Sequence, residues 1–339
     1  MTEIKENFQL KGFNTFGVDV SCKYFTEVTS EKELQDLISN DKYTKSPKFV
    51  LGGGSNILFT KNFDGIILHN RFEGIGVVSV DEDYAFVKAG AGEIWHDLVL
   101  YCLGKNFGGI ENLSLIPGFV GAAPIQNIGA YGEELKNVFH SLTAVDLSTG
   151  EPKIFSAEEC RFGYRDSIFK REAKNKYIIT DVTLRVNKKP AINTTYGAIE
   201  KELEHMHITS PTIRDVSNAV IKIRTGKLPD PKLLGNCGSF FKNPTIPIEK
   251  YDRLQQVFPD LVAYPAQGNA MKLSAGWMIE KCGWKGKRNG NVGMHKDQAL
   301  VLVNYGGATG RELLTHAAEV QKSVKENFGI IMEAEVNVL

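Results

Sequence analysis

Residues 108–132 form a glycine-rich segment whose residue types could enclose a ligand closely. Small residues let the backbone approach a ligand, and Pro117 and Pro124 stiffen the path of the chain. Gln126 and Asn127 supply amide groups for hydrogen bonds. A loop of this length is usually functional or disordered, and its apolar content favours an ordered, functional loop. We therefore expect a rigid apolar slot around a large, flat cofactor; the alternative is a packed Ω-loop without a ligand.

A second glycine run, formed by Gly52, Gly53, Gly54, Ser55 and Asn56, lies between two strand-like segments. The Rossmann and Walker phosphate loops need a helix after the glycines, and no Gly-Lys-Ser/Thr sequence occurs here. Neither motif is therefore present. A glycine turn can still direct several backbone N–H groups at a pyrophosphate as an anion nest. The alternative is a plain β-turn.

Length and composition limit the classes of protein that can carry these segments. The 339 residues predict two or three domains, at roughly 150 residues per domain. Equal numbers of basic and acidic residues, 40 of each, argue against nucleic acid or an anionic membrane as a partner. The five cysteines are widely separated and the histidines show no metal-ligand spacing, which argues against disulfides and metal sites. No apolar run approaches the roughly 20 residues of a membrane span, so the sequence predicts a soluble, cytoplasmic protein.

Capping residues and periodicity predict the elements that position the two glycine runs. Ser30 with Glu33, and Thr309 with Glu312, are capping-box pairs that start helices. Further helices are expected at residues 93–103, 210–224 and 273–282. Strands are expected at residues 49–51, 57–59, 66–68, 76–81, 84–89, 142–147, 177–186, 299–303 and 331–338. These elements predict an α+β fold.

Four sequence blocks occur in an order that resembles one enzyme family. The blocks are Gly52–Asn56, Ile116–Gly132, Tyr164–Ser167 and Gly238–Pro244. The chain resembles the UDP-N-acetylenolpyruvoylglucosamine reductases (MurB), flavoenzymes of bacterial peptidoglycan synthesis, and the similarity runs from Asn14 to Glu335. The second and fourth blocks are its most specific parts.

The resemblance implies a two-subdomain FAD-binding fold of the vanillyl-alcohol-oxidase/MurB type plus a smaller α+β substrate-binding domain. We expect residues 1–71, joined by the carboxy-terminal strand 330–339, to form the first FAD-binding subdomain. Residues 72–223 would form the second subdomain and residues 224–329 the substrate-binding domain. Non-covalent FAD would have its pyrophosphate at Gly52–Asn56. The rest of the cofactor would lie against Gly118, Gly121, Ala122, Pro124, Gln126, Asn127, Gly129, Ala130, Tyr131 and Gly132.

The resemblance also assigns reacting and substrate-binding residues. Arg165 matches an arginine beside the flavin and the substrate carboxylate, Ser239 matches the proton donor, and Glu335 matches the late glutamate of the acid motif. Tyr196 matches a substrate-covering tyrosine found in the branch of the family that carries an extra loop. The substrate-binding positions together are Tyr164, Tyr196, Lys227, Asn243 and Gln298.

The implied chemistry suits these residue types. A guanidinium such as that of Arg165 stabilises negative charge next to the substrate carboxylate, and a positioned hydroxyl such as that of Ser239 can donate the final proton. We expect Glu335 to be protonated when it orients the intermediate. The structural alternatives are an ion pair of Arg165 with Asp166 or Glu172, a turn or cap role for Ser239, and an exposed strand position for Glu335.

The resemblance therefore implies an NADPH-dependent FAD enzyme. It would convert the small molecule UDP-N-acetylglucosamine enolpyruvate to UDP-N-acetylmuramate, in the service of cell-wall biogenesis, cell shape and cell division. We expect a monomer without nucleic-acid or membrane partners. The alternatives are another FAD-dependent oxidoreductase or oxidase of the same fold, and a non-catalytic nucleotide-sugar sensor. The joint presence of Arg165, Ser239 and Glu335 argues against both alternatives, because neither explains a proton donor.

Overall fold

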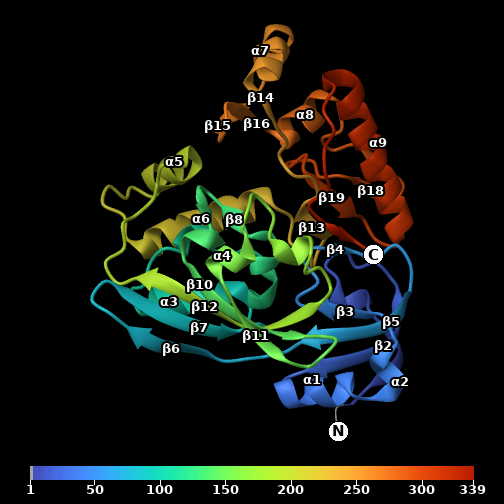
Figure 1. The fold of residues 1–339 in the computed structure, drawn as a ribbon. Helices are drawn as coiled ribbons and strands as arrows, with labels where there is room; N and C mark the ends of the chain where they lie inside the picture. Colours follow the sequence, from blue (N-terminus) through green and yellow to red (C-terminus); the bar gives the residue numbers. More distant parts are fainter. Residues whose placement is uncertain (1–2) are drawn as a thin grey trace. The chain divides into compact units, whose positions relative to one another are not determined.

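The computed structural model describes residues 3–339, which fall into two compact units (Figure 1). Unit 1 comprises residues 3–8, 22–53 and 63–226, and unit 2 comprises residues 9–21, 54–62 and 227–339. The glycine run at residues 52–56 therefore passes from unit 1 into unit 2 after Gly53. The division into three domains expected from the sequence stays a prediction.

The first sheet of unit 1 has parallel strands and a layer of helices. Its strand order is β1–β2–β5–β3, for β1 (Lys5–Gln9), β2 (Ser21–Val28), β5 (Phe63–Asn70) and β3 (Lys48–Leu51). Between β2 and β3 the chain forms α1 (Glu31–Ile38) and α2 (Asp41–Thr44). The Ser30 hydroxyl accepts a hydrogen bond from the Glu33 N–H as predicted, but the Glu33 carboxylate accepts from Thr29 N–H rather than from Ser30. The helix start is confirmed, and its capping box is shifted by one residue.

The second sheet of unit 1 is antiparallel, with strand order β11–β10–β12–β7–β6. The strands are β6 (Ile75–Val80), β7 (Tyr84–Gly90), β10 (Phe139–Asp146), β11 (Pro152–Ser156) and β12 (Tyr177–Asn187). The helices of this part are α3 (Trp95–Gly104), α4 (Ala157–Cys160), α5 (Gly197–His205) and α6 (Ile213–Lys227). The predicted hairpin of β6 and β7 is confirmed, and its loop is held by the Asp81 carboxylate, which accepts from the N–H groups of Asp83 and Tyr84.

The glycine-rich segment at residues 108–132 is ordered by short turns rather than by long elements. It contains the 3₁₀ turns η2 (Glu111–Leu113), η3 (Val120–Ala122) and η4 (Pro124–Gln126), followed by β8 (Gly129–Ala130), which pairs with β9 (Glu133–Glu134). Val120 and Ile128 are buried in the same hydrophobic core as the second sheet. The apolar residues therefore fix the segment, as their number predicts.

Unit 2 contains two further antiparallel sheets. The larger has the order β13–β19–β18–β17, for β13 (Gly235–Ser239), β19 (Val301–Asn304), β18 (Val292–Met294) and β17 (Arg288–Asn289). The smaller has the order β14–β16–β15, for β14 (Thr245–Pro247), β16 (Ala270–Leu273) and β15 (Ala263–Ala266). The helices are α7 (Ile248–Val257), α8 (Ala275–Lys281) and α9 (Gly310–Phe328). The capping box of Thr309 and Glu312 at the start of α9 is confirmed.

The predicted closing strand at residues 331–338 is wrong. The chain there pairs first with one segment and then with another: Ala334 bridges Phe241, whereas β20 (Asn337–Val338) runs parallel to β4 (Ile57–Leu58). Alternating residue types predict an extended chain but cannot show that its two halves have different partners. Figure 1 places β4 and the C terminus close together within unit 2.

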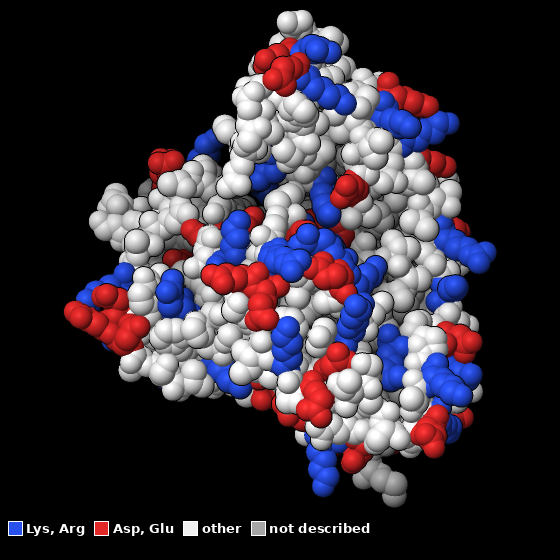
Figure 2. All heavy atoms as spheres, viewed as in Figure 1, with Lys and Arg blue, Asp and Glu red and all other residues white. Residues whose placement is uncertain are grey.

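The composition of the surface agrees with the balanced sequence. Figure 2 shows basic and acidic side chains interspersed over the face in view. Among the residues that the structure describes, no helix is both long and apolar enough to cross a membrane, and no group of potential ligands is arranged to hold a metal ion. The five cysteines are free thiols, and burial raises the pKa of Cys22 to about 11 and that of Cys102 to about 12.

Thermal stability is expected to fall as the pH drops below 6.5, because His316 is buried as a neutral ring. The ring packs edge-on against Trp284, and neither nitrogen has a hydrogen-bond partner among residues 3–339. Burial lowers the pKa of His316 from its usual 6.5, which outweighs the opposite effect of Glu319; Lys287 lowers it further. The unfolded chain therefore takes up the proton first, and stability present above pH 6.5 is lost as the pH falls through the folded pKa.

Thermal unfolding at pH about 7.5 and about 5.5 measures this loss. If folding lowers the pKa of His316 by one, protonation of the ring in the folded protein removes about 1.4 kcal/mol of folding stability. His316→Leu removes the titrating group, so its melting temperature should change less between the two pH values than that of the wild type. An equal change in both proteins would show that other groups cause the acid sensitivity.

Candidate active site

A tight turn in unit 1 carries Arg165. Gly163 and Asp166 exchange two backbone hydrogen bonds of 3.0 and 3.3 Å, which leaves Tyr164 and Arg165 as the two central residues. Arg165, the second of these central residues, has φ +53°, in the left-handed region that a type II turn requires at this position. We call residues 163–166 the arginine turn. A non-glycine residue in this conformation carries backbone strain, which is common where a side chain must be aimed.

The guanidinium of Arg165 is directed by the glycine-rich segment. Its Nη2 donates to the carbonyl oxygen of Gly129 at 2.7 Å. A Cβ atom at Gly129 would lie 3.1 Å from Nη1 of Arg165 and 2.8 Å from the Glu133 carbonyl oxygen, so only glycine leaves room for the side chain. The Tyr164 ring lies 5.5 Å from the guanidinium carbon and adds a cation–π contact.

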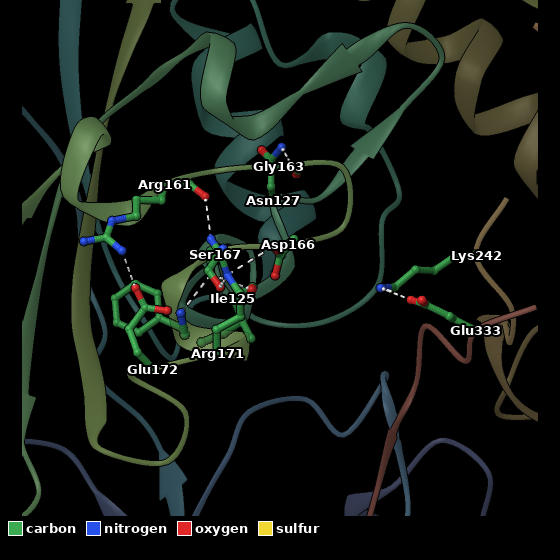
Figure 3. Close-up of polar contacts among 11 residues, drawn as sticks. Ile125, Asn127, Arg161, Gly163, Asp166, Ser167, Arg171, Glu172, Lys242 and Glu333 are labelled. Atoms are coloured by element: carbon green, nitrogen blue, oxygen red, sulfur yellow. Dashed lines mark hydrogen bonds and ion pairs between the residues drawn. The ribbon is translucent and has the colours of Figure 1, made fainter. Parts of the chain in front are cut away.

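The two carboxylates considered as ion-pair partners for Arg165 each pair with another arginine. Asp166 pairs with Arg171 at 3.2 Å, and Glu172 pairs with Arg161 at 2.7 Å (Figure 3). The acidic residues next to the arginine turn are therefore engaged by two other arginines.

A second arginine, which the sequence analysis did not single out, lies close to Arg165. Arg224 hydrogen-bonds the Tyr131 side chain, and its Nε donates to the Leu115 carbonyl oxygen at 3.3 Å. Burial lowers the pKa of Arg224, Tyr131 raises it and Arg165 lowers it again. Two guanidinium groups within electrostatic reach of one another create a positive region suited to an anionic ligand. The sequence signal is its spacing: Arg224 lies one helical turn before Lys227.

Aromatic residues from two predicted sets meet in the same region. The rings of Tyr131 and Tyr196 are 5.3 Å apart at an interplanar angle of 86°. Tyr196, with 42% of its surface exposed, precedes α5 as its N-cap residue. The ring pair is linked to the arginine turn through the glycine-rich segment, because Arg165 bonds Gly129, two residues before Tyr131.

Gly52 and Gly53, the part of the first glycine run that lies in unit 1, pack against the glycine-rich segment. A Cβ atom at Gly53 would stand 3.2 Å from the Cα of Gly118 and 3.3 Å from the Phe119 ring. At Gly121 it would lie 2.6 Å from the Cβ of Ala91. Contacts this close leave no room for a larger residue at these positions.

Unit 2 brings Ser239 and Glu335 together. Ser239 ends β13 after an irregular step in which Gly238 has φ +73°, and it is exposed whereas Phe240 and Phe241 are buried. The Glu335 N–H donates to the carbonyl oxygen of Phe240 at 2.8 Å. Glu335 is therefore bonded to the residue that directly follows Ser239.

The exposed glutamate of the final segment is Glu333, not Glu335. Glu333 pairs with Lys242 at 3.0 Å (Figure 3), whereas Glu335 is half-buried. Burial and the Glu335 charge raise the pKa of Cys237, which places the carboxyl group near that thiol. The Asn56 side chain donates to the Glu335 carbonyl oxygen at 3.4 Å, so the predicted pyrophosphate turn also contacts this segment.

Two predicted substrate-binding residues meet at the start of α8. The Asn243 side-chain oxygen accepts from the Ala275 N–H at 3.0 Å. A Cβ atom at Gly276 would lie 3.4 Å from the Gln298 side-chain oxygen. Lys227, at the end of α6, begins the main segment of unit 2 and is exposed.

The other predicted cofactor residues occupy the turns of the glycine-rich segment. They are Ala122 in η3, Pro124 and Gln126 in η4, Ala130 in β8, and Gly132, with Ser55 following Gly54 in unit 2. Gly54 is enclosed by the Phe13 backbone, which a Cβ atom would strike. The Asn127 side chain is fully buried and bonds only protein groups, so its amide does not have the position expected for a cofactor contact.

Comparison with known proteins agrees with these features. Residues 22–156, which contain both glycine runs, match the family model described as FAD binding domain. A mixed helix and sheet fold with this domain defines the chain as an FAD-binding protein of the α+β class, as predicted. Residues 230–339 match the C-terminal domain of UDP-N-acetylenolpyruvoylglucosamine reductase.

Relatives extend the match to the whole chain. The reductase of this name from Flavobacterium johnsoniae is 51% identical over 99% of this chain and 100% of its own length. That from Pseudomonas aeruginosa is 46% identical over 99% of both chains. The crystal structure of the MurB enzyme from Thermus caldophilus has the same fold, with a TM-score of 0.66 and 24% identity, over 100% of this chain and 98% of that one. The chain belongs to the UDP-N-acetylenolpyruvoylglucosamine reductase family.

Proposed function

We propose that this chain reduces UDP-N-acetylglucosamine enolpyruvate to UDP-N-acetylmuramate, with FAD as cofactor and NADPH as reductant. One observation carries the proposal: reductases of this name match 99% of the chain, through both the FAD-binding and the C-terminal domain. The reaction is a step of peptidoglycan synthesis. The enzyme is expected to act in the cytoplasm as a monomer.

The residues of the two glycine runs fit FAD. The close approach of Gly53 to Gly118 brings the two glycine runs together, and we propose that both line the cofactor. Backbone N–H groups of Gly52–Asn56 would hold the pyrophosphate, and the segment from Gly118 to Gly132 would line the rest. When bound, FAD takes up a hydride from NADPH and supplies it to the methylene carbon of the substrate.

Arg165 is proposed to stabilise the charge that this reduction creates. Hydride addition leaves negative charge on the carbon beside the substrate carboxylate, and a guanidinium bound to that carboxylate lowers its energy. The hydrogen bond to Gly129 fixes the direction of the guanidinium before substrate arrives, so little reorganisation is needed. Arg224, whose pKa the neighbouring Arg165 charge helps to lower, would add to the positive potential.

Ser239 is proposed to donate the proton that completes the product. Its hydroxyl is exposed at the end of β13, next to buried phenylalanines that fix the backbone on one side. A weakly acidic hydroxyl can protonate a carbanion-like centre because that centre is strongly basic. Glu335, tied by its backbone to Phe240, would orient the same centre from the neighbouring segment.

The remaining predicted contacts concern the substrate's nucleotide. We propose that Asn243 and Gln298, which meet at the start of α8, bind the diphosphate and uridine end together with Lys227. Tyr164 and Tyr196 are proposed as further substrate contacts. The ring contact between Tyr196 and Tyr131 supports this placement, since it holds an otherwise exposed tyrosine beside the cofactor segment.

NADPH consumption that begins only on addition of UDP-N-acetylglucosamine enolpyruvate tests the function. The purified protein should carry the yellow absorbance of oxidised flavin and should form one UDP-N-acetylmuramate for each NADPH oxidised. Equal consumption of NADPH or oxygen without that substrate would instead indicate an oxidase. Substrate binding without any NADPH oxidation would indicate a sensor.

A further inference from the structure

The arginine turn is attached to the glycine-rich segment at three points. The Gly163 carbonyl oxygen accepts from Nδ2 of Asn127 at 2.9 Å, and the hydroxyl of Ser167 donates to the Ile125 carbonyl oxygen at 2.7 Å. Between them, the Arg165 guanidinium donates to Gly129. The first residue of the turn, its central side chain and the residue that follows the turn are therefore bonded to residues 125–129.

The two side chains that attach the backbone of this region to the glycine-rich segment are completely buried. Asn127 and Ser167 each expose 0% of their surface. Asn127 itself lies in the left-handed region with φ +44°, at the end of η4. Its amide also donates to the Glu134 carboxylate at 3.0 Å and accepts from the Lys136 N–H at 3.0 Å. Three hydrogen bonds hold this buried amide in a single orientation, so it fixes the arginine turn relative to the glycine-rich segment.

We propose that Asn127 and Ser167, which we call the clamp, are positioning residues that set Arg165 relative to the cofactor segment. Neither side chain is accessible to a ligand, so their role is exerted through Arg165. The proposal rests on the proposed function, because it takes Arg165 as the group that stabilises the reaction's negative charge. Misplacement of a reacting group by about 1 Å can reduce the rate roughly 100-fold, which is the scale of effect expected here.

A purely structural role is the competing explanation. Each clamp hydrogen bond lies in the protein interior, and leaving a buried partner unsatisfied lowers the stability of the fold in any case. Loss of stability or of flavin therefore cannot distinguish the two roles. The distinguishing quantity is kcat per bound flavin, together with its dependence on Arg165.

The experiment uses the flavin-bound enzyme and four variants: Asn127→Ala, Ser167→Ala, Arg165→Ala and the double variant of Asn127→Ala with Arg165→Ala. With substrate saturating, kcat per bound flavin should fall about 10- to 100-fold in each clamp variant. Flavin reduction by NADPH alone should stay within about twofold of the wild-type rate, because it does not use the substrate carboxylate. In the double variant, Asn127→Ala should add little to the loss caused by Arg165→Ala, since residues that act through one group are not additive.

Asn70→Ala is the matched control. Asn70 is also buried in unit 1 and donates from its amide to a carbonyl oxygen, that of Ile179 at 2.7 Å, without contacting the arginine turn. It should lose a similar amount of thermal stability while keeping kcat per bound flavin. Clamp variants with wild-type kcat, or a double variant in which the two losses multiply fully, would overturn the proposal. Wild-type enzyme that fails to oxidise NADPH with substrate would instead defeat the proposed function.

Discussion

Ser239→Ala is expected to stop product formation while the enzyme still binds FAD and still accepts hydride from NADPH. A positioned general acid contributes roughly 10²–10⁴-fold to the rate, so turnover should fall by that factor. The substitution removes only one oxygen from an exposed residue at the end of β13, and it keeps the backbone pairing with Val301. The fold is therefore expected to survive, and the loss should be confined to the protonation of the reduced substrate.

Two measurements separate this outcome from a general defect. Mixing the variant with NADPH should bleach the flavin at the wild-type rate, and adding the enolpyruvyl substrate should then restore the oxidised spectrum slowly or not at all. Thr245→Ala, which removes an exposed hydroxyl from β14 in the same unit, should behave as wild type in both steps. Unimpaired turnover of Ser239→Ala would remove Ser239 from the mechanism.

Arg165→Ala is expected to lower kcat by roughly 10²–10³-fold, or about 3–4 kcal/mol of transition-state stabilisation. The charge on the substrate grows as the hydride arrives, so a group aimed at it in advance acts more strongly on the transition state than on the bound substrate. Steady-state kinetics over a range of substrate concentrations separates kcat from KM. A change confined to KM would mean that Arg165 only binds the carboxylate.

Arg161→Ala provides the comparison for that variant. Arg161 lies close in sequence and forms an ion pair with Glu172, but 67% of its side chain is exposed. Exposed pairs of this kind contribute about 0–1 kcal/mol to stability, and the Arg161 backbone that accepts from Arg171 is kept. The kcat and KM of Arg161→Ala should therefore match the wild-type values. This result would show that losing a positive charge near the turn does not by itself lower the kcat of Arg165→Ala.

Local signals in the sequence predicted the elements that depend on local chemistry. The capping box of Thr309 and Glu312 defines the start of α9, and the polar turn around Asp81 defines the hairpin of β6 and β7, because in both cases a side chain bonds backbone a few residues away. The closing segment failed for the opposite reason. Its partners, Phe241 and Ile57, are distant in sequence and come from different parts of unit 2.

The candidate site likewise has features that the sequence predicts and features that depend on the folded chain. Glycines in runs indicated close backbone approach, and the contact of Gly53 with Gly118 agrees with that interpretation. The amide of Asn127 was expected at the cofactor because residue type shows that a group can donate hydrogen bonds but not to which acceptor. Arg224 was missed since its helix looks ordinary, and only the folded chain places it beside Tyr131.

The left-handed backbone of Arg165 has a consequence for attempts to evolve this protein in the laboratory. At φ +53° an ordinary side chain costs about 1–2 kcal/mol, a cost that glycine avoids and asparagine partly avoids. A library of variants selected for thermal stability alone would favour those two residues at position 165. It would therefore enrich stable variants that lack activity. Stabilising screens should therefore hold this codon fixed, or score turnover alongside survival.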